Sequence, residues 1–231
     1  MAERQQFLAR MLTELRGGLI VSCQAPPGDP LCDTDILARM AIAAWRGGAV
    51  GIRANGPDSI RAIRQAVPLP LIGLYKDGET GVYITPTIEH AHAVIAAGAD
   101  IVALDGTQRP RPNGEQLATI IAAVHAEADK LVMADVSTLD EGLAAQAAGA
   151  DFVSTTLSGY TPYSPQIEGP DLELVQALAA RLRTPVIAEG RIRAPSDARA
   201  ARRAGGFAVV VGAAITRPEW ITAQFVDGLR R

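Results

Sequence analysis

The stretch Ala97-Gly98-Ala99-Asp100-Ile101-Val102-Ala103-Leu104-Asp105 joins the end of a helical pattern to a short apolar run that closes on a carboxylate. Ala148-Gly149-Ala150-Asp151 and Ala204-Gly205-Gly206 repeat its beginning, and each again leads into an apolar run. Glycine takes the left-handed turn that ends a helix at little steric cost. The repeat therefore predicts a helix–turn–strand unit that occurs several times along the chain.

Apolar runs of this kind recur through all 231 residues, and each precedes a polar or glycine-bearing loop and a helical pattern. We predict that each is a buried strand. The runs are Leu19 to Gln24, Ala49 to Arg53, Leu71 to Lys76, Ile101 to Asp105, Leu131 to Asp135, Phe152 to Thr156, Val186 to Glu189, and Ala208 to Gly212.

Helices are predicted between these strands by period and by end signals. Asp33 to Arg46 begins near acidic residues and stops at two glycines, and Asp58 to Val67 halts before a proline. Strict alternation of strand and helix requires parallel strands with right-handed crossovers. We therefore predict a single domain over residues 1–231, a (β/α)8 TIM barrel of the α/β class, with an extra N-terminal helix from Ala2 to Arg16 closing its bottom. The alternative is an open doubly wound sheet, which is disfavoured because no GxGxxG follows the first strand.

Composition limits the possible partners and compartments. The chain is 48% apolar and only 4% aromatic, and 22 basic residues face 25 acidic ones, for a net charge of −3. The basic residues are scattered, so no nucleic-acid partner is expected. Cys23 and Cys32 form no CxxC pair, and the first 16 residues contain charges in place of an apolar signal core. A cytoplasmic protein with no membrane partner is expected. A homodimer, the commonest assembly among soluble oligomers, is the expected partnership.

The residues that close the eight runs are mostly polar, whereas the residues that open them are mostly apolar, glycine or proline. In a TIM barrel the loops after the strands build the active site, so this segregation predicts a polar site at one end of the barrel. The closing residues are Gln24, Arg53, Lys76, Asp105, Asp135, Thr155 with Thr156, Glu189, and Gly212.

Lys76 and Glu189 are the two candidates for proton transfer. A lysine held in a desolvated mouth can lose its proton near neutral pH and act as a base. Glu189 follows four small apolar residues, an unfavourable place for an unpaired charge. The structural alternatives are a solvated loop lysine and a glutamate in a salt bridge. If the two face each other, they form an acid/base pair suited to moving a proton next to a carbonyl.

Other closing residues are candidates for binding a substrate. Asp135 and Asp105 could bind sugar hydroxyls or orient a lysine, although carboxylates in barrels also anchor loops. Arg53 and Gln24 could hold a carbonyl oxygen or a developing enediolate, and for Gln24 loop packing is an equal alternative.

The last two strands end in glycine-bearing turns, which predict a phosphate site. Gly190, Gly212 and Ala213 could offer backbone N–H groups to a phosphate, and Arg217 could add a full positive charge. Glycine turns also end strands for steric reasons alone. The long sixth loop, Leu157 to Pro165, contains two tyrosines and two prolines and could close over a substrate as a lid.

A series of motifs in this order resembles the N-acetylmannosamine-6-phosphate 2-epimerase family over nearly the whole chain. The strings are Ile52-Arg53-Ala54-Asn55, Leu74-Tyr75-Lys76, Ile84-Thr85-Pro86-Thr87, Ala103-Leu104-Asp105-Gly106-Thr107, Met133-Ala134-Asp135-Val136-Ser137-Thr138, Thr156-Leu157-Ser158-Gly159-Tyr160-Thr161, Ala188-Glu189-Gly190-Arg191-Ile192, and Val211-Gly212-Ala213-Ala214-Ile215-Thr216-Arg217-Pro218. One departure from the family is the proline-rich first loop, Ala25 to Pro30.

The resemblance implies an isomerase of sialic-acid breakdown that interconverts the 6-phosphates of N-acetylmannosamine and N-acetylglucosamine without metal or organic cofactor. It implies that Lys76 and Glu189 are catalytic. It also implies that Gln24, Arg53, Asp135 and Arg217 bind substrate, and that Gly190 and Gly212 lie in phosphate-binding turns.

Two other interpretations remain open: a Schiff-base aldolase in which Lys76 attacks a carbonyl, and a sugar-phosphate sensor without activity. A metal-dependent epimerase is disfavoured, since His90, His92 and His125 fall in predicted helices away from the strand ends.

Overall fold

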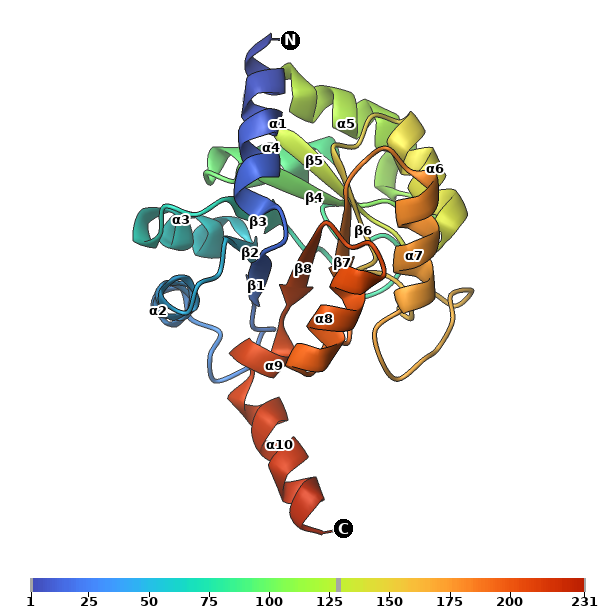
Figure 1. Ribbon diagram of the computed structural model, residues 1–231. Coiled ribbons are helices and arrows are strands. Elements are labelled where there is room, and N and C mark those ends of the chain that lie inside the picture. The colour runs from blue at the N-terminus through green and yellow to red at the C-terminus, as the bar shows by residue number, and fades with distance from the viewer. Residues whose placement is uncertain (1, 128–129, 231) are drawn as a thin grey trace.

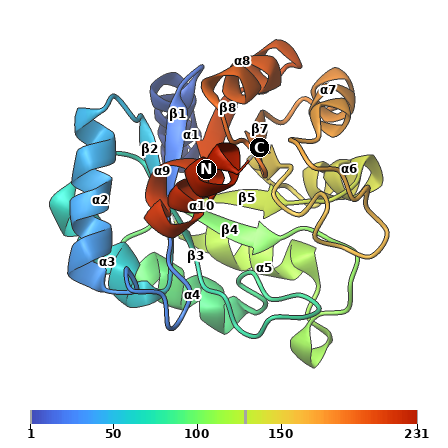
Figure 2. The same ribbon diagram turned by 90° about the horizontal axis from the view of Figure 1, so that it is seen from below.

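The computed structural model describes residues 2–127 and 130–230. Its strands are parallel and pair in chain order until β8 returns to β1, so the sheet is a closed barrel (Figures 1 and 2). This closure confirms the predicted TIM barrel and excludes the open sheet. The strands are β1 (Leu19–Cys23), β2 (Gly51–Asn55), β3 (Leu71–Leu74), β4 (Ile101–Asp105), β5 (Leu131–Asp135), β6 (Phe152–Ser154), β7 (Val186–Glu189) and β8 (Ala208–Val211).

Helices surround the barrel and connect successive strands. They are α1 (Ala2–Leu15), α2 (Thr34–Arg46), α3 (Pro57–Ala66), α4 (Ile88–Ala96), the short 3-10 helix η1 (Pro112–Gly114), α5 (Leu117–Ala126), α6 (Leu139–Ala147), α7 (Leu172–Arg181), α8 (Pro195–Arg203), α9 (Ala213–Thr216) and α10 (Pro218–Leu229). In the described part of the chain, no helix has the length and apolarity needed to cross a bilayer.

Side-chain caps fix where several helices begin. Asp33 accepts hydrogen bonds from the amides of Asp35 and Ile36, so α2 starts one residue after the predicted boundary. Thr138 and Glu141 form a capping box at the start of α6. These caps hold the first turn of each helix directly after the loops that follow β1 and β5.

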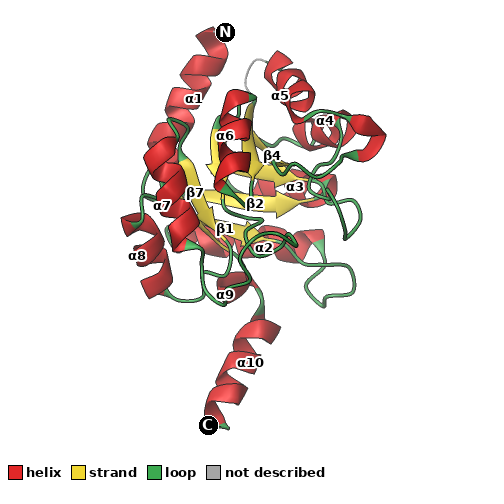
Figure 3. Cartoon of the chain, turned by 90° about the vertical axis from the view of Figure 1, so that its right-hand side faces the viewer, coloured by secondary structure: helices red, strands yellow, loops and turns green. Residues whose placement is uncertain are grey.

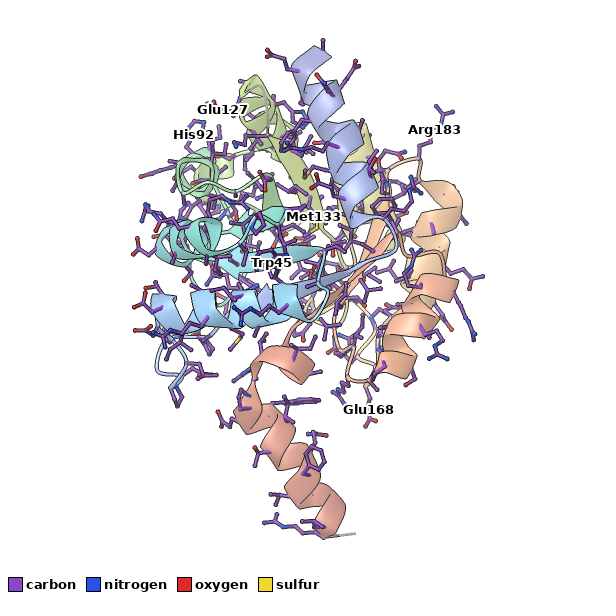
Figure 4. The ribbon with its side chains drawn as sticks, turned by 60° about the vertical axis from the view of Figure 1, so that its left-hand side comes forward. Trp45, His92, Glu127, Met133, Glu168 and Arg183 are labelled. Carbon is purple, nitrogen blue, oxygen red and sulfur yellow. The ribbon has the colours of Figure 1, made fainter. Side chains whose placement is uncertain are left out.

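Side chains alternate between the inside and the outside of the barrel, as strand geometry requires. Ile101 and Ala103 pack in the interior, whereas Val102 and Leu104 pack against the surrounding helices. Met133 belongs to the same interior cluster and is labelled in Figure 4. The interior is thus a packed core of aliphatic layers and one phenylalanine.

Five predicted strands have different bounds in the structure: the first, sixth and eighth end one or two residues earlier, at Cys23, Ser154 and Val211, and the second and third differ as follows. The second begins at Gly51 instead of Ala49, because the Ala49 amide donates to Ala44 O at 3.0 Å and still belongs to the turn that ends α2. The third ends at Leu74 instead of Lys76. Lys76 forms a separate antiparallel bridge with Ile84, which turns the chain back over the strand end.

The N-terminal helix lies at the predicted end of the barrel. Met11 and Leu15 of α1 are buried and pack against the interior cluster that includes Ile20. Arg4 anchors the outer half of the helix through a 2.6 Å ion pair with Asp151. The helix therefore covers the ends at which the strands begin, opposite the end with the polar closing residues.

The C-terminal helix departs from a regular barrel. Figures 1 and 3 both show α10 extending away from the body of the molecule, beyond the short α9. No described residue of α10 is buried, and Phe225 and Leu229 are 72% and 88% exposed.

Candidate active site

The polar closing residues share one side of the strand alternation. Residues two positions apart in a strand face the same way. Glu189 therefore lies on the same side as the interior residue Ile187, and Asp135 lies on the same side as the interior residues Leu131 and Met133. The same parity leads from Ile72 and Leu74 to Lys76. A polar layer therefore stands on top of the apolar interior layers. Its members are Gln24, Arg53, Lys76, Asp105, Asp135, Thr156, Glu189 and Gly212.

Arg53 and Asp135 form the centre of this layer. Nη2 of Arg53 lies 2.6 Å from Asp135 Oδ2, and Nη1 lies 3.0 Å from Oδ1. Both side chains are almost completely buried. Burial alone would lower the pKa of Arg53, but Asp135 and Glu189 outweigh it and raise that pKa above its ordinary value. Arg53 is therefore a permanent cation at the base of the mouth.

Glu189 joins the same cation from the opposite side. Its Oε2 lies 2.7 Å from Arg53 Nη1 and 3.0 Å from Thr156 Oγ1. The side chain is 13% exposed. Burial raises the pKa of Glu189 against the opposing effect of Arg53, and the charge of Asp135 adds to the rise. The carboxyl group can thus hold a proton at a pH where an ordinary glutamate is ionised.

Lys76 lies on the same rim and its backbone is fixed. Its amide donates to Asn55 Oδ1 at 2.9 Å, and its bridge to Ile84 fixes the other edge. The residue as a whole is exposed, but the surrounding mouth partly desolvates its ammonium group. That desolvation, followed by the charge of Arg53, lowers the pKa of Lys76. Its amine takes part in none of the hydrogen bonds or ion pairs found among the described residues.

Lys76 and Glu189 face one mouth from distant strands. Lys76 follows β3 and Glu189 ends β7, and these strands are four apart in the eight-stranded ring. Each acts on the pKa of the other, and both interact with Arg53 and Asp135. The structure therefore brings together four of the predicted residues as one electrostatic unit.

Asp105 belongs to a separate cluster. It accepts hydrogen bonds from Thr107 Oγ1 at 2.6 Å and Arg109 Nη2 at 2.7 Å. Burial raises its pKa, and the hydrogen bonds from Thr107 oppose that effect. These contacts hold the loop after β4, which is the anchoring role considered for this carboxylate.

Gln24 and Arg217 lie at neighbouring strand ends, outside the Arg53 unit. Gln24 is half-buried and donates to Ser22 Oγ at 2.9 Å. Arg217 lies 3.6 Å from Asp29 of the proline-rich first loop, and its buried Nε has no hydrogen-bond partner among the described residues. Its amide donates to Ala213 O at 3.2 Å, so Arg217 closes the turn that begins at Gly212.

The two predicted phosphate turns have backbone features that favour an anion. Gly190 has φ +111°, a conformation that side chains rarely adopt. Gly212 is the N-cap of α9 and Ala213 is its first residue, so the Ala213 amide has no acceptor within that helix. Both turns follow strands seven and eight, at the same end of the barrel as Lys76 and Glu189.

The sixth loop is tied to the loop after β7. Arg191 Nε donates to Gly169 O at 2.8 Å and Nη1 donates to Ser158 O at 2.5 Å. Tyr163 donates to Glu141 at 2.7 Å, while Tyr160 is 56% exposed. The role of a closing lid stays a prediction.

Two residues of the mouth had no role in the sequence analysis. Thr156 contacts Asp135, Glu189 and Arg53 through one hydroxyl. The half-buried Tyr83 has a pKa raised by burial and by the nearby carboxylates of Asp105 and Asp135. The alternation that marks Glu189 also marks Thr156, but Tyr83 lies in an irregular loop where no period applies.

The histidines lie where they were predicted, in α4 and α5. His92 is exposed and projects outward in Figure 4. His125 bonds Asp151 at 2.8 Å, near the opposite end of the barrel. Within residues 2–127 and 130–230, no group of three or more His, Cys, Asp or Glu side chains could hold a metal ion.

Comparison with known proteins shows the family of this chain. The family described as "Putative N-acetylmannosamine-6-phosphate epimerase" matches residues 37–231. Two curated relatives bear the description "Putative N-acetylmannosamine-6-phosphate 2-epimerase". The protein from Cutibacterium acnes is 50% identical over 97% of this chain and 99% of its own length, and that from Caldanaerobacter subterraneus is 52% identical over 95% and 94%.

A solved structure extends this likeness to three dimensions. The N-acetylmannosamine-6-phosphate 2-epimerase from Clostridium perfringens superposes with a TM-score of 0.91 at 46% identity, over 94% of this chain and 95% of that one. The match spans the barrel and all the strand ends that form the mouth. This chain therefore belongs to the N-acetylmannosamine-6-phosphate epimerase family.

Proposed function

We propose that this protein interconverts N-acetylmannosamine 6-phosphate and N-acetylglucosamine 6-phosphate, in the breakdown of sialic acids and amino sugars. The observation that carries the proposal is the pairing of Lys76 and Glu189 across one mouth, with one pKa lowered and the other raised. An environment that lowers the pKa of one titratable group and raises the pKa of another makes the two suited to exchanging protons with a substrate.

The reaction requires the hydrogen at C2 to leave one face of the sugar and return to the other. When the ring opens, the C1 aldehyde makes that hydrogen acidic, because the electron pair left on C2 spreads onto the carbonyl oxygen. Neutral Lys76 takes the proton and becomes an ammonium group. Protonated Glu189 then delivers its own proton to the opposite face of C2 and becomes a carboxylate.

The charges of the site favour this exchange. Arg53 and Asp135 neutralise each other, so Lys76 and Glu189 share one proton when the site is neutral overall. That proton resides on Glu189 before the reaction and on Lys76 afterwards, and the reverse reaction restores it. Since β3 and β7 are four strands apart, a substrate between their ends presents one face to each residue.

The remaining predicted residues bind the substrate in this proposal. Arg53 and Gln24 stabilise the oxygen that gains negative charge at C1, and Asp135 keeps Arg53 in place. Gly190, Gly212 and Ala213 hold the phosphate by their amides. Arg217, whose Nε has no partner among the described residues, adds a positive charge to that phosphate site.

Incubation with N-acetylmannosamine 6-phosphate in heavy water tests the proposal. By proton NMR, the native protein should form N-acetylglucosamine 6-phosphate with deuterium at C2. Lys76→Ala should lose both product and exchange, whereas Glu189→Ala should lose the product and keep at most the exchange that Lys76 catalyses on its own face. Absence of turnover by the native protein would favour a sugar-phosphate sensor. Undiminished exchange in both variants would refute the residue assignment.

The Schiff-base alternative predicts a covalent step that the epimerase does not need. Borohydride added during turnover should leave Lys76 unmodified, as judged by mass spectrometry of the peptide that contains it. A reduced adduct on that peptide would favour an aldolase.

We also infer a cytoplasmic location and a homodimer. Cys23 and Cys32 are both free thiols, as a reducing compartment allows. For the dimer, the support comes from α10, the helix that follows β8. In a regular barrel that helix packs over β8 and β1, but here it extends into solvent.

An apolar groove lies at the position that the last helix of a regular barrel would cover. Its volume is about 370 Å³, and its lining includes Leu19, Val209, Val211, Ala198 and Ala214 together with Arg193 and Arg202. We infer that α10 of a second copy covers this groove and that the exchange is reciprocal. Such an exchange closes a two-fold symmetric dimer and buries Phe225 and Leu229.

A further inference from the structure

The hydroxyl of Thr156 lies between the two carboxylates of the mouth. Its Oγ1 is 2.7 Å from Asp135 Oδ1 and 3.0 Å from Glu189 Oε2. Ser154 Oγ lies 2.8 Å from the same atom, and Arg53 Nη1 lies 3.3 Å from it. One hydroxyl group thus contacts a second hydroxyl, a guanidinium and both acids.

The number of hydrogens limits what this hydroxyl can do. A threonine hydroxyl donates once and accepts up to two hydrogen bonds. Arg53 can only donate to it, and Ser154 can donate as well. The single hydrogen of Thr156 is then left for either Asp135 or Glu189.

The contact determines which oxygen of Glu189 is available. Oε2 is occupied by Arg53 Nη1 and Thr156 Oγ1. No hydrogen bond among the described residues reaches Oε1. A proton exchanged with a substrate would therefore pass through Oε1, provided that the carboxyl plane is held.

We propose that Thr156 is a positioning residue for the proton transfer: its hydroxyl holds Oε2 of Glu189 and presents Oε1 to the substrate. The inference rests on the proposed epimerase function. When Glu189 is ionised, the Thr156 hydrogen points to it. When Glu189 is protonated on Oε1, Oε2 remains an acceptor, so the contact can hold the carboxyl plane in both states.

The other groups that face Glu189 are Arg53 from β2, Lys76 after β3 and Asp135 from β5. Of these contacts, the hydrogen bond from Thr156 is the one that a nearly isosteric substitution removes without changing a charge. The Thr156 bond lowers the pKa of Glu189 and so opposes the rise caused by burial. Removing it should make the Glu189 proton harder to release.

Thr156→Val removes the hydroxyl and Thr156→Ser keeps it. Valine should lower kcat about tenfold, the effect of one hydrogen bond to a charged group, with KM nearly unchanged. The alkaline limb of the bell-shaped pH profile should move to higher pH, because that limb reports loss of the proton that Glu189 holds before the reaction. Serine should restore both.

Thr155→Val is the matched control. Thr155 bonds the backbone of Glu189, donating to its carbonyl oxygen at 2.9 Å and accepting from its amide at 3.0 Å. Its loss should lower the midpoint of thermal unfolding but leave the alkaline limb in place. An equal shift of the alkaline limb in both valine variants, or no shift with Thr156→Val, would overturn the inference.

A readout without substrate separates this inference from the proposed reaction. In protein labelled with ¹³C-glutamate, the Glu189 carboxyl resonance can be assigned from its absence in Glu189→Gln. Its titration should move to higher pH in Thr156→Val and stay in place in Thr156→Ser. This result would hold even if the native protein did not turn over the proposed sugar. An unchanged titration in a folded Thr156→Val protein would refute the contact.

Discussion

Arg53 binds Asp135 through both of its terminal nitrogens, with Nη2 2.6 Å from Oδ2 and Nη1 3.0 Å from Oδ1. Because both side chains are removed from solvent, neither charge is stable without the other. The fixed charges of this pair act on the pKa values of Lys76 and Glu189. Its integrity is therefore a condition for both folding and proton transfer.

Removal of Arg53 should destabilise the protein strongly. Arg53→Leu leaves Asp135 as an uncompensated buried carboxylate, so the free energy of unfolding should fall by about 3–5 kcal/mol. Urea denaturation measures the change. The exposed Asp58–Arg61 pair offers the control, since Arg61→Ala should alter stability by less than about 0.5 kcal/mol. Similar losses in the two variants would contradict the importance of burial.

Glu189 should impose a pH dependence on stability. Its pKa is raised in the native state, so the native protein retains a proton that the unfolded chain releases. The resulting stabilisation is present below the ordinary pKa of glutamate and is lost as pH rises through the raised value. In Glu189→Gln the side chain at this position is neutral at every pH. The free energy of unfolding of the variant, relative to that of the native protein, should therefore increase from acidic to neutral pH.

Urea unfolding at several pH values measures that gain. The exposed Glu168, between the sixth loop and α7, provides the control: Glu168→Gln should keep a constant difference from the native protein. A difference for Glu189→Gln that shrinks with rising pH would mean that the ionised carboxylate is the favoured form in the fold.

Strand alternation accounts for how much of the site the sequence could predict. A period of two places every second residue in the barrel interior, so a polar residue two positions beyond an interior Ile or Met must join the mouth. Asp135 and Glu189 follow this rule directly. Lys76 follows it too, although its strand ends at Leu74 and a bridge to Ile84 carries the parity onward.

Contacts that depend on irregular backbone could not be predicted in the same way. Tyr83 reaches the mouth from a loop that turns back at Thr85, which has φ +46°. The contact of the Thr156 hydroxyl with both carboxylates depends on how far β5, β6 and β7 are shifted along one another. The strand register sets this shift, and amino-acid composition does not reveal it. The helical pattern of Pro218–Leu229 likewise does not reveal that α10 extends away from the barrel (Figure 1).

Arg191 should control the order of the sixth loop. It bonds the carbonyl oxygens of Ser158, at the start of that loop, and of Gly169, four residues beyond its end. Arg191→Ala should therefore speed limited proteolysis between residues 158 and 169 and raise KM more than it lowers kcat. Arg203→Ala, at an exposed position on α8, should leave the cleavage rate unchanged. Equal rates in the two variants would show that other contacts hold the loop.

Gly73 should tolerate no side chain. It lies on the outer face of β3, where an added Cβ would be 2.7 Å from Ala99 Cβ and from Val94 Cγ1, and 2.9 Å from Ile60 Cδ1. Gly73→Ala should lower the free energy of unfolding by about 1–3 kcal/mol through overpacking. Gly169 is the control, because an added Cβ there meets nothing within 4 Å. Denaturant midpoints that agree between the two alanine variants would contradict the close packing of β3.

Charge on the apolar face of α10 should separate the proposed dimer. Phe225 and Leu229 are one turn apart and share a face of the helix, so Phe225→Lys with Leu229→Lys would bring two ammonium groups to a groove that is apolar apart from two arginines. Light scattering during gel filtration should report twice the chain mass for the native protein and one chain mass for the double variant. Gln224→Lys, at an exposed position about a quarter turn from Phe225, should remain dimeric. A native protein that stays monomeric at every concentration would refute the exchange. In that case no second copy covers the apolar face of α10.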